Sequence, residues 1–321
     1  TTLSFEISES IKMGTVTWQA VEGSDPSSPY KRSILGEKLK GGVFQDFTFI
    51  SPPELINGVY YNIMIEGTDL AGNESEVMVV DQLLYDTVPP QFIDLKPFEG
   101  EYIKEPVISY TITENLDTGK IFFDYIGGEN DPKATHMITL VGSKKQKGIR
   151  GGKLPSSIIS LTNGAIYNIR FEGKDAAGNS SSETIINNIT FDNELPVILI
   201  NEPINKSFFN NSMFSYNLSE DLVESNIIIT REAGSPDRNS PHTISLKDDY
   251  LKAGDRIISD IKWVDGSTYS VTMNGVDRAG NNPFKISTLS QIYYDITPPI
   301  ITINKINNNK HIRLNTLSYT L

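Results

Sequence analysis

Apolar and polar residues alternate with a period of two in many short segments of this chain. One such segment carries the apolar row Tyr61, Ile63 and Ile65, and the same alternation returns at residues 167–171 and 269–273. A period of two with one apolar face is typical of a half-buried β-strand. Glycine and proline interrupt these segments at strand-and-turn spacing, and helical periodicity is nearly absent. The pattern therefore predicts an all-β protein.

A turn motif, Asp-x-Ala-Gly-Asn, follows each of these strands. It occupies residues 69–73, 175–179 and 277–281. Asp accepts backbone N–H bonds at the start of such a turn, and glycine takes the positive φ that closes it. The copies lie roughly 105 residues apart, which is the size of one immunoglobulin-like sandwich and too long for a small solenoid repeat.

Two more blocks recur in step with this turn, a strand segment and an aromatic-Asp pair that precedes proline. The strand segment occupies 3–9, 108–114 and 214–220, with a further start at Leu317, and the aromatic-Asp pair begins at Tyr85, Phe191 and Tyr294. We expect tandem Ig-like (Greek-key) β-sandwiches, three units and the start of a fourth. The expected divisions are 1–87 for the first unit without its first strand, 88–193 for the second, 194–296 for the third, and 297–321 for the first strands of a fourth.

A tyrosine opens the penultimate strand of each unit at a fixed distance from an upstream corner. The spacing is Leu or Trp, then Gly three residues later, then Tyr three residues after that; the tyrosines are Tyr61, Tyr167 and Tyr269. A tyrosine placed there can return its hydroxyl to the upstream backbone, as in the tyrosine corner of Greek-key sandwiches. We therefore predict such a corner in each unit.

With these motifs the chain resembles the Ig-like and fibronectin-III-like tandem repeats of large bacterial surface proteins of the adhesin type. The resemblance rests on the strand entry, the Asp-x-Ala-Gly-Asn turn and the Tyr-Asp-x-x-Pro-Pro junction, and it covers essentially the whole chain. It implies an extracellular, secreted or surface-bound array that acts as a stalk, spacer or adhesin shaft and is not an enzyme. It also implies calcium at some domain junctions. The second unit departs from the pattern because a single Pro196 replaces the double proline.

The amino-acid composition limits the classes of partner and of chemical site that we expect. Lys plus Arg number 28 against 40 Asp plus Glu, a formal net charge of −12, so a nucleic acid partner is not expected. The chain has 0 Cys and 3 His, which excludes disulfides and thiolate metal sites and leaves little imidazole chemistry. No apolar run reaches the roughly 20 residues of a membrane span. Phosphate loops and hydrolase motifs are absent from the sequence.

Strand order in such a sandwich brings certain loops to the pole where the preceding linker enters. In the second unit this gathers Asp86, Glu114, Asp117, Asp175 and Asn179. In the third unit it gathers Asp192, Glu220, Asp221, Asp277 and Asn281. Converging carboxylates repel one another, and Ca²⁺ with six to eight oxygen ligands would relieve that repulsion. The alternative is hydrogen bonding within the turns without any metal, which is the more common use of such residues.

The remaining motifs favour structural roles. His136 and His242 fall at equivalent positions without a carboxylate or serine at catalytic spacing, and Lys144–Arg150 is a small basic segment typical of a solvated loop. Loops 23–30, 128–135 and 234–241 differ between units, so an array that binds glycans or a cell-surface protein through them is one alternative function.

The ends of the chain suggest another alternative. The first unit lacks a first strand, and Ile300-Ile301-Thr302-Ile303 is a spare one. Exchange of this strand between copies would build a self-assembling surface filament or sheath. The competing expectation, which we favour, is that residues 1–321 are part of a longer array in which neighbouring repeats of the same protein fill both gaps.

Overall fold

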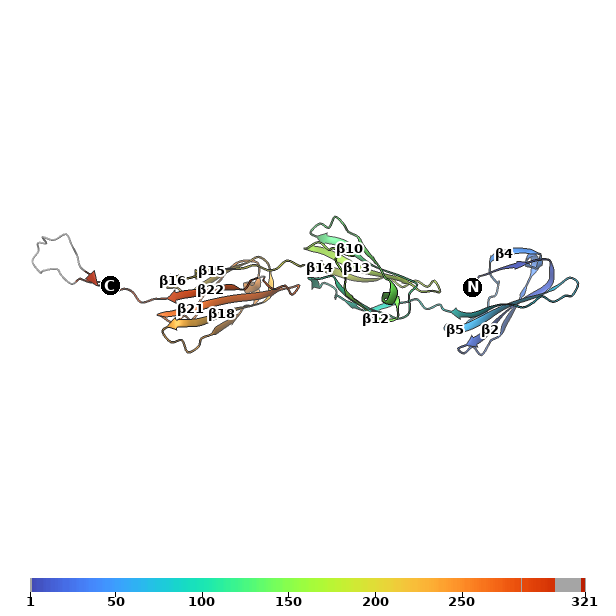
Figure 1. The fold of residues 1–321 in the computed structure, drawn as a ribbon, viewed down its shortest axis with the longest axis horizontal. Helices are drawn as coiled ribbons and strands as arrows, with labels where there is room; N and C mark the ends of the chain where they lie inside the picture. The colour runs from blue at the N-terminus through green and yellow to red at the C-terminus, as the bar shows by residue number, and fades with distance from the viewer. Residues whose placement is uncertain (1, 284, 304–318, 321) are drawn as a thin grey trace, which may run out of the picture.

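The structure, a computed structural model, describes residues 2–283, 285–303 and 319–320. In these residues the chain is almost entirely β-strand, with short 3-10 helices at Gly36–Leu39, Gly142–Lys145 and Asp248–Leu251. The strands form three β-sandwiches that follow one another along an elongated molecule (Figure 1). The predicted all-β, Ig-like sandwich fold class is confirmed. None of the helices in the described residues has the length and apolar character that a membrane crossing requires.

The first sandwich has one four-stranded sheet and one pair of strands. Its strands are β1 (Leu3–Ile7), β2 (Ile11–Glu22), β3 (Tyr30–Ile34), β4 (Gly42–Phe47), β5 (Val59–Asp69) and β6 (Met78–Tyr85). The larger sheet has the order β3-β2-β5-β6, and β1 pairs with β4 alone. The alternation predicted around Tyr61 therefore lies in β5, in the middle of the larger sheet.

The second and third sandwiches share a fuller plan of a five-stranded and a three-stranded sheet. The second contains β7 (Phe92–Lys96), β8 (Tyr102–Ile103), β9 (Val107–Ile112), β10 (Thr118–Gly128), β11 (His136–Thr139), β12 (Gly148–Lys153), β13 (Ala165–Lys174) and β14 (Thr184–Phe191). Its sheets have the orders β11-β10-β13-β14-β8 and β12-β9-β7.

The third sandwich repeats this topology. It contains β15 (Ile198–Glu202), β16 (Phe208–Phe209), β17 (Phe214–Leu218), β18 (Leu222–Gly234), β19 (His242–Ser245), β20 (Gly254–Ile258), β21 (Ser267–Asp277) and β22 (Ser287–Tyr294). Its sheets have the orders β16-β22-β21-β18-β19 and β15-β17-β20. After it, β23 (Thr302–Ile303) pairs antiparallel with β24 (Tyr319–Thr320). The rest of the predicted fourth unit, residues 304–318 and 321, lies outside the described residues, and the unit boundaries stay predictions.

Each sandwich buries its own apolar cluster. Trp18 and Tyr61 lie in the first cluster, Phe123 and Tyr167 in the second, and Tyr269 in the third. The apolar faces of the alternating strands supply these residues, since every second side chain of a strand points to the same side. The first cluster has the fewest buried residues, and β6 at its edge is almost wholly exposed.

The predicted tyrosine corner is confirmed in all three sandwiches. In each one the tyrosine hydroxyl accepts a hydrogen bond from a backbone N–H five residues earlier, which fixes the bend that leads into the strand. The donor and acceptor residues, each pair 3.0 Å apart, are Ile56 and Tyr61, Thr162 and Tyr167, and Val264 and Tyr269.

Candidate metal centre

The Asp-x-Ala-Gly-Asn motif forms the turn that we expected after β13. Asp175 Oδ1 accepts the backbone N–H of Asn179 at 2.8 Å, and Asp175 Oδ2 accepts Asn179 Nδ2 at 2.8 Å. Gly178 has a φ of +95°, a conformation that side chains with a Cβ rarely adopt. The same bonds form at Asp277 and at Asp69, so the turn is a local product of its sequence.

In two places this turn also holds the linker that comes from the preceding sandwich. Asn179 Nδ2 donates to the carbonyl oxygen of Asp86 at 3.1 Å. Asn281 Nδ2 donates to the carbonyl oxygen of Asp192 at 3.0 Å. The linker aspartate is therefore tied to the turn of the next sandwich, and its side chain is placed beside the turn carboxylate.

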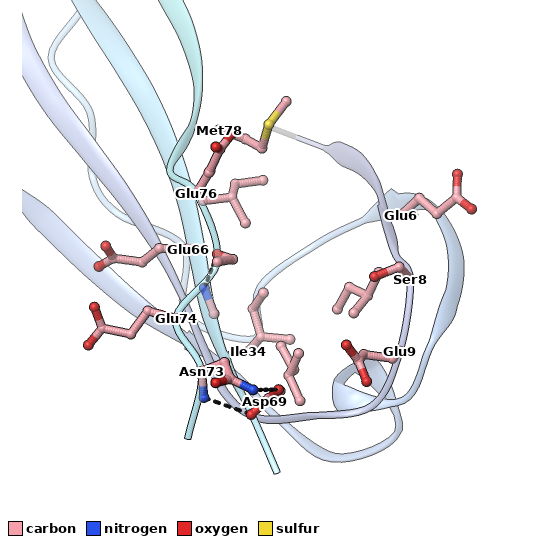
Figure 2. Close-up of a pocket in the computed structure, with 15 residues that line it drawn as sticks. Glu6, Ser8, Glu9, Ile34, Glu66, Asp69, Asn73, Glu74, Glu76 and Met78 are labelled. Carbon is pink, nitrogen blue, oxygen red and sulfur yellow. Dashed lines mark hydrogen bonds between the residues drawn. The ribbon is translucent and has the colours of Figure 1, made fainter. Parts of the chain in front are cut away.

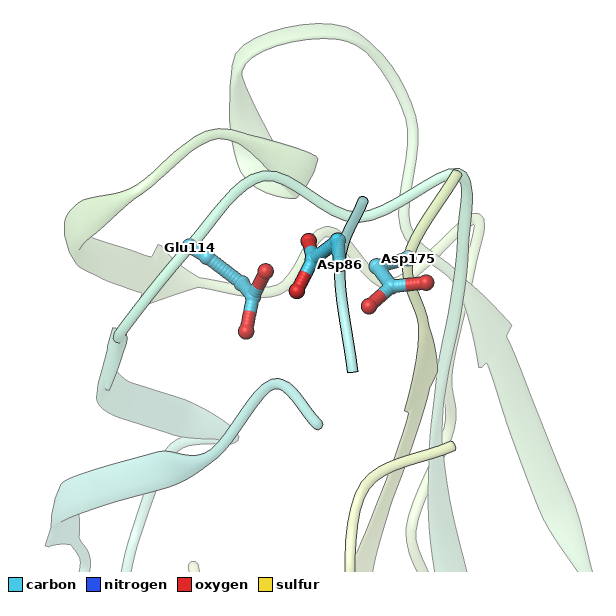
Figure 3. Close-up of side chains that lie close together, drawn as sticks. All are labelled: Asp86, Glu114 and Asp175. Carbon is cyan, nitrogen blue, oxygen red and sulfur yellow. The ribbon is translucent and has the colours of Figure 1, made fainter. Parts of the chain in front are cut away.

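Three carboxylates meet at each of these junctions. Near the second sandwich the carboxylate oxygens of Asp86, Glu114 and Asp175 lie within 4.8 Å of one another (Figure 3), and we call this group the first acidic cluster. Asp192, Glu220 and Asp277 form the corresponding second acidic cluster. Each cluster combines a linker residue, a residue after the second-strand position and the first residue of the turn.

The glutamate of each acidic cluster has a raised pKa. Burial, followed by the charges of Asp86 and Asp175, raises the pKa of Glu114 above its ordinary value. Burial together with Asp192 and Asp277 raises the pKa of Glu220 further, to about 7. The glutamate of each cluster is therefore harder to ionise than a free glutamate, first because it is buried and then because other carboxylates lie close to it.

The turn aspartate behaves in the opposite way. Burial opposes the ionisation of Asp175, but the bonds from Asn179 and from the turn backbone outweigh it, so its pKa lies below the ordinary value. Asp175 is 4% exposed and Asp277 is 1% exposed. Asp175 is thus held in its ionised form, whereas burial and neighbouring carboxylates raise the pKa of Glu114, of Glu220 and of the linker residue Asp192.

Two of the predicted residues do not join the clusters. Asp117 is exposed, and its carbonyl oxygen, rather than its carboxylate, accepts Lys145 Nζ. Asp221 lies 2.9 Å from Lys252 Nζ and accepts the backbone N–H of Ala253. Asn179 and Asn281 act as hydrogen-bond donors to the linker and to the turn aspartate. Of the five residues predicted at each junction, the structure thus brings three together, and these three are the carboxylates of the cluster.

The first sandwich carries the same turn without a complete cluster. Glu9, Asp69 and Asn73 line one groove, but three carboxylates do not converge to the same distance within its described residues 2–87. The two acidic clusters each contain a linker aspartate, Asp86 or Asp192, in addition to the equivalents of Glu9 and Asp69.

The chemistry of the clusters suits a hard cation. All the groups that converge are carboxylate oxygens, which Ca²⁺ and Mg²⁺ prefer over softer metals. Ca²⁺ tolerates irregular sets of six to eight oxygen ligands, whereas Mg²⁺ demands a near-ideal octahedron. Among common metal ions calcium therefore fits best to a cluster of three carboxylates at the edge of solvent.

A second set of hydrogen-bonded carboxylates escaped the sequence analysis. The hydroxyl of Tyr167 donates to Asp131 Oδ2 at 2.6 Å, and His136 Nε2 lies 2.6 Å from the same oxygen. Asp131 is 6% exposed; burial raises its pKa, but the bonds from Tyr167 and His136 outweigh this and lower it to about 2. The corresponding groups elsewhere are Asp237 with His242 and Tyr269, and Asp25 with Tyr30 and Tyr61.

These aspartates lie inside the loops that we considered for ligand binding. In each loop the carboxylate points inward and fixes the loop to the tyrosine corner. The signal in the sequence was an aspartate five residues before the histidine or tyrosine, at Asp25, Asp131 and Asp237. The histidines His136 and His242 are thereby hydrogen-bonded structural residues of the corner.

Comparisons with known proteins add little to this description. No protein-family model matches the chain, and no curated protein matches it. The chain is similar to the FN1–FN3 domains of chicken CNTN1, with 12% sequence identity, 90% of this chain and 91% of that chain covered, and a TM-score of 0.28. It is also similar to a structure from a 1.5-MDa bacterial ice-binding adhesin, with 10% identity, 90% and 88% covered, and a TM-score of 0.28. Likenesses at this TM-score carry no conclusion about function.

Proposed function

We propose that the chain is a structural repeat array of a bacterial extracellular surface protein, in which it acts as a stalk, spacer or adhesin shaft. The observation that carries the proposal is the bond from the turn asparagine to the linker carbonyl oxygen, made by Asn179 to Asp86 and by Asn281 to Asp192. This bond ties the exit of one sandwich to the entry pole of the next. A repeated, directed joint is what a spacer needs.

Two other features support the same role. The linkers contain proline, and Pro90 and Pro196 are buried, so the backbone between sandwiches has restricted φ and little freedom. The three sandwiches lie end to end (Figure 1), which gives length with short connections. A net charge of −12 keeps similar neighbouring molecules apart in solution.

Calcium at the two acidic clusters is part of this proposal. Three carboxylates within 4.8 Å of one another repel, and a cation held between them would link the linker aspartate to both loops of the next sandwich. The residues that would hold it are Asp86, Glu114 and Asp175 at one junction and Asp192, Glu220 and Asp277 at the other. Bound calcium would supply charge neutralisation and stiffness, and the proposal assigns no catalytic residue.

Calorimetric titration of the chelator-treated chain with calcium tests the metal. We expect two sites, of which Glu114→Gln weakens one and Glu220→Gln the other. Asp117→Asn is the matched control, because Asp117 is an exposed carboxylate three residues from Glu114 that stays outside the cluster. Absence of binding, or equal weakening by Asp117→Asn, would reject calcium and leave the spacer proposal standing.

Small-angle X-ray scattering tests the spacer role separately. We expect an elongated particle whose maximum dimension is retained at all protein concentrations that keep it monomeric. The double variant Asn179→Ala and Asn281→Ala should broaden the distance distribution, because the linkers lose their bond to the next turn. A compact particle for the unaltered chain would contradict the proposed function.

A further inference from the structure

One loop recurs in all three sandwiches with a similar backbone but with different charge. It consists of the short 3-10 helix and the residues that follow it, 36–42, 142–148 and 248–254. In the second sandwich the loop carries three lysines and no acidic residue, whereas in the third it carries Asp248, Asp249 and one lysine. The strongly basic form of the loop is therefore a property of the second sandwich, in a chain whose net charge is −12.

The backbone of this loop is fixed from the neighbouring strand. Arg150 on β12 donates from Nε to the carbonyl oxygen of Gln146 at 3.0 Å and from Nη2 to that of Lys147 at 2.6 Å. Arg256 makes the same kind of bonds to two carbonyl oxygens of the loop in the third sandwich. The loop therefore keeps its shape whichever side chains it carries, and its lysines are presented from a preformed backbone.

Lys145 occupies a position at which the other two sandwiches have leucine. Leu39 and Leu251 are partly buried there and pack against the cores of the first and third sandwiches. Lys145 Nζ instead donates to the carbonyl oxygen of Asp117. A lysine at this position gives up buried apolar area, and such departures from the structural pattern are expected at functional sites.

Lys145 lies beside a groove on the second sandwich. The groove has a volume of about 380 Å³ and lies between the start of β10 and the segment that follows β11. Lys120 on β10 also lines it, whereas the other two sandwiches have Thr15 and Asn226 at this register position. The volume is sufficient for a small ligand, and both ammonium groups are specific to this sandwich.

The rest of the groove combines apolar and polar groups. Leu140 and Val141 supply the apolar part, and Val141 is 65% exposed. Thr118 and Thr139 supply exposed hydroxyls, and Asp117 supplies an exposed carboxylate. A sugar ring has an apolar C–H face and several hydroxyls, so this lining can contact both.

The lysines around the groove lack ion-pair partners. Four of them, which we call the basic patch, lie on the loop and on the adjacent strand: Lys120, Lys144, Lys145 and Lys147. Within the described residues no carboxylate forms an ion pair with any of the four, whereas Lys153 of the same sandwich pairs with Glu105. Several ammonium groups without carboxylate partners attract an anionic ligand.

The first sandwich presents negative charge at the corresponding pole. Figure 2 shows Glu66 and Glu74 beside the turn at Asp69 and Asn73. An anionic ligand would be repelled by these carboxylates. The second sandwich is therefore the one that suits such a ligand.

We propose that the groove and the basic patch of the second sandwich bind an acidic glycan, a chain of sugars that carry carboxylate or sulfate groups. Lys120 and Lys145 bind the acidic group of a sugar through charge-assisted hydrogen bonds. Asp117 and the two threonine hydroxyls bind ring hydroxyls, and Val141 packs against the C–H face. The remaining lysines of the basic patch attract acidic groups of the neighbouring sugars.

The lining favours a glycan over a nucleic acid. The groove contains no aromatic side chain among its described residues on which a base could stack, and its carboxylate suits sugar hydroxyls rather than phosphates. The choice of a glycan also rests on the extracellular location in the proposed function. Binding itself requires neither calcium nor the elongated shape of the array.

Calorimetric titration of the full chain in the presence of a chelator tests the proposal. The probes are tetragalacturonate, which carries carboxylates, and a heparin-derived tetrasaccharide, which also carries sulfates. We expect saturable binding of at least one probe, weakened by added salt, and the stronger probe identifies the preferred acidic group. Fully methyl-esterified tetragalacturonate has the same rings without the charges and should not bind.

Lys145→Leu is the decisive variant. It introduces the residue that the other two sandwiches have at this position, so the temperature of unfolding should be unchanged or higher, while glycan affinity should fall more than about tenfold. Lys120→Asn, which introduces the residue of the third sandwich, should also weaken binding. Lys133→Ala is the matched control, because Lys133 is an exposed lysine of the same sandwich outside the groove, and affinity should be unchanged.

Four results would overturn the proposal. They are no binding of either acidic tetrasaccharide, unchanged affinity in Lys145→Leu, equal losses in Lys145→Leu and Lys133→Ala, and equal affinity for the esterified probe or for a single-stranded DNA of similar charge. Each would leave the scattering test of the spacer role unaffected, so failure of glycan binding and failure of the proposed function are distinguishable.

Discussion

The two acidic clusters are built from the same motif but differ in the charges around them. In the first, Lys147 opposes the rise in the pKa of Glu114. In the second, Glu194 and Asp221 add negative charge, and the pKa of Glu220 reaches about 7. The turn and linker place the carboxylates in the same way. Burial is the largest cause of the raised pKa in both glutamates, and loop residues outside the motif add to it or oppose it.

The second junction also has direct contacts between sandwiches. Lys104 of the second sandwich donates from Nζ to the carbonyl oxygen of Gly280 in the third at 2.5 Å. The guanidinium of Arg278 lies 5.5 Å from the ring centroid of Tyr102. Two cationic side chains thus connect the second and third sandwiches directly, in addition to the linker bond.

The largest expected effect comes from the asparagines that hold the linkers. Asn281→Ala removes the bond to the buried Asp277 carboxylate and the bond to the linker, and should lower the free energy of unfolding of the third sandwich by about 3 kcal/mol. Asn179→Ala should cost slightly less in the second sandwich, because Asp175 is less buried. Hydrogen exchange resolved by mass spectrometry reports each sandwich separately.

Asn73→Ala is the matched control for these variants. Asn73 is exposed and bonds to Asp69, but it holds no linker in the described structure of the first sandwich. We expect little change there. A loss as large as that of Asn281→Ala would show that the turn alone, without the linker bond, accounts for the effect.

The next effect is a dependence of stability on pH in the cation-free chain. Folding raises the pKa of Glu220 from 4.5 to about 7, so the stability this group contributes is complete below pH 4.5 and is lost as pH rises through 7. The loss should be about 1–2 kcal/mol in the third sandwich after allowance for solvent screening. Hydrogen exchange measured at both ends of this pH range tests the prediction. The stability of the second sandwich should change less than that of the third.

Glu220→Gln should have a smaller effect of opposite sign. Removing the titrating charge should stabilise the cation-free third sandwich at neutral pH by about 1 kcal/mol and flatten its pH dependence. Glu114→Gln should stabilise the second sandwich less. Asp221→Asn is the control variant, and it should not stabilise the sandwich, because Asp221 pairs with Lys252. If Asp221→Asn stabilised the third sandwich as much as Glu220→Gln does, the assignment of Glu220 as the titrating group would be wrong.

Lys104→Ala should have the smallest effect. Its contact with Gly280 is exposed, and such contacts contribute at most about 0.5–1 kcal/mol. We expect thermal unfolding to be nearly unchanged, with a slight broadening of the scattering distance distribution. A large loss of stability would show that the direct contact, more than the linker bond, holds the second junction.

The sequence was a good guide where structure is local or repeated. The period of two placed the apolar face of β5 at Tyr61, and the turn at Asp175 folds from its own residues. Strand order predicted that Asp86, Glu114 and Asp175 would share one pole, as the structure shows. Whether calcium binds them remains a proposal.

The sequence was a poor guide where partners come from distant loops. Asp221 was expected beside Glu220, but Lys252 from another loop attracts its carboxylate away. Asp131 was overlooked because its partner Tyr167 lies 36 residues later and only the folded corner brings them together. An aspartate in a variable loop resembles a solvated residue until its buried partner is known.

The parallel pairing of β8 with β14 has a mechanical consequence. The chain enters the second sandwich through β7, which pairs with β9, continues into β8 and leaves after β14. Once β7 is pulled away from β9, a pull on the two ends loads the hydrogen bonds between β8 and β14 in shear. The third sandwich has the same protection in β16 and β22.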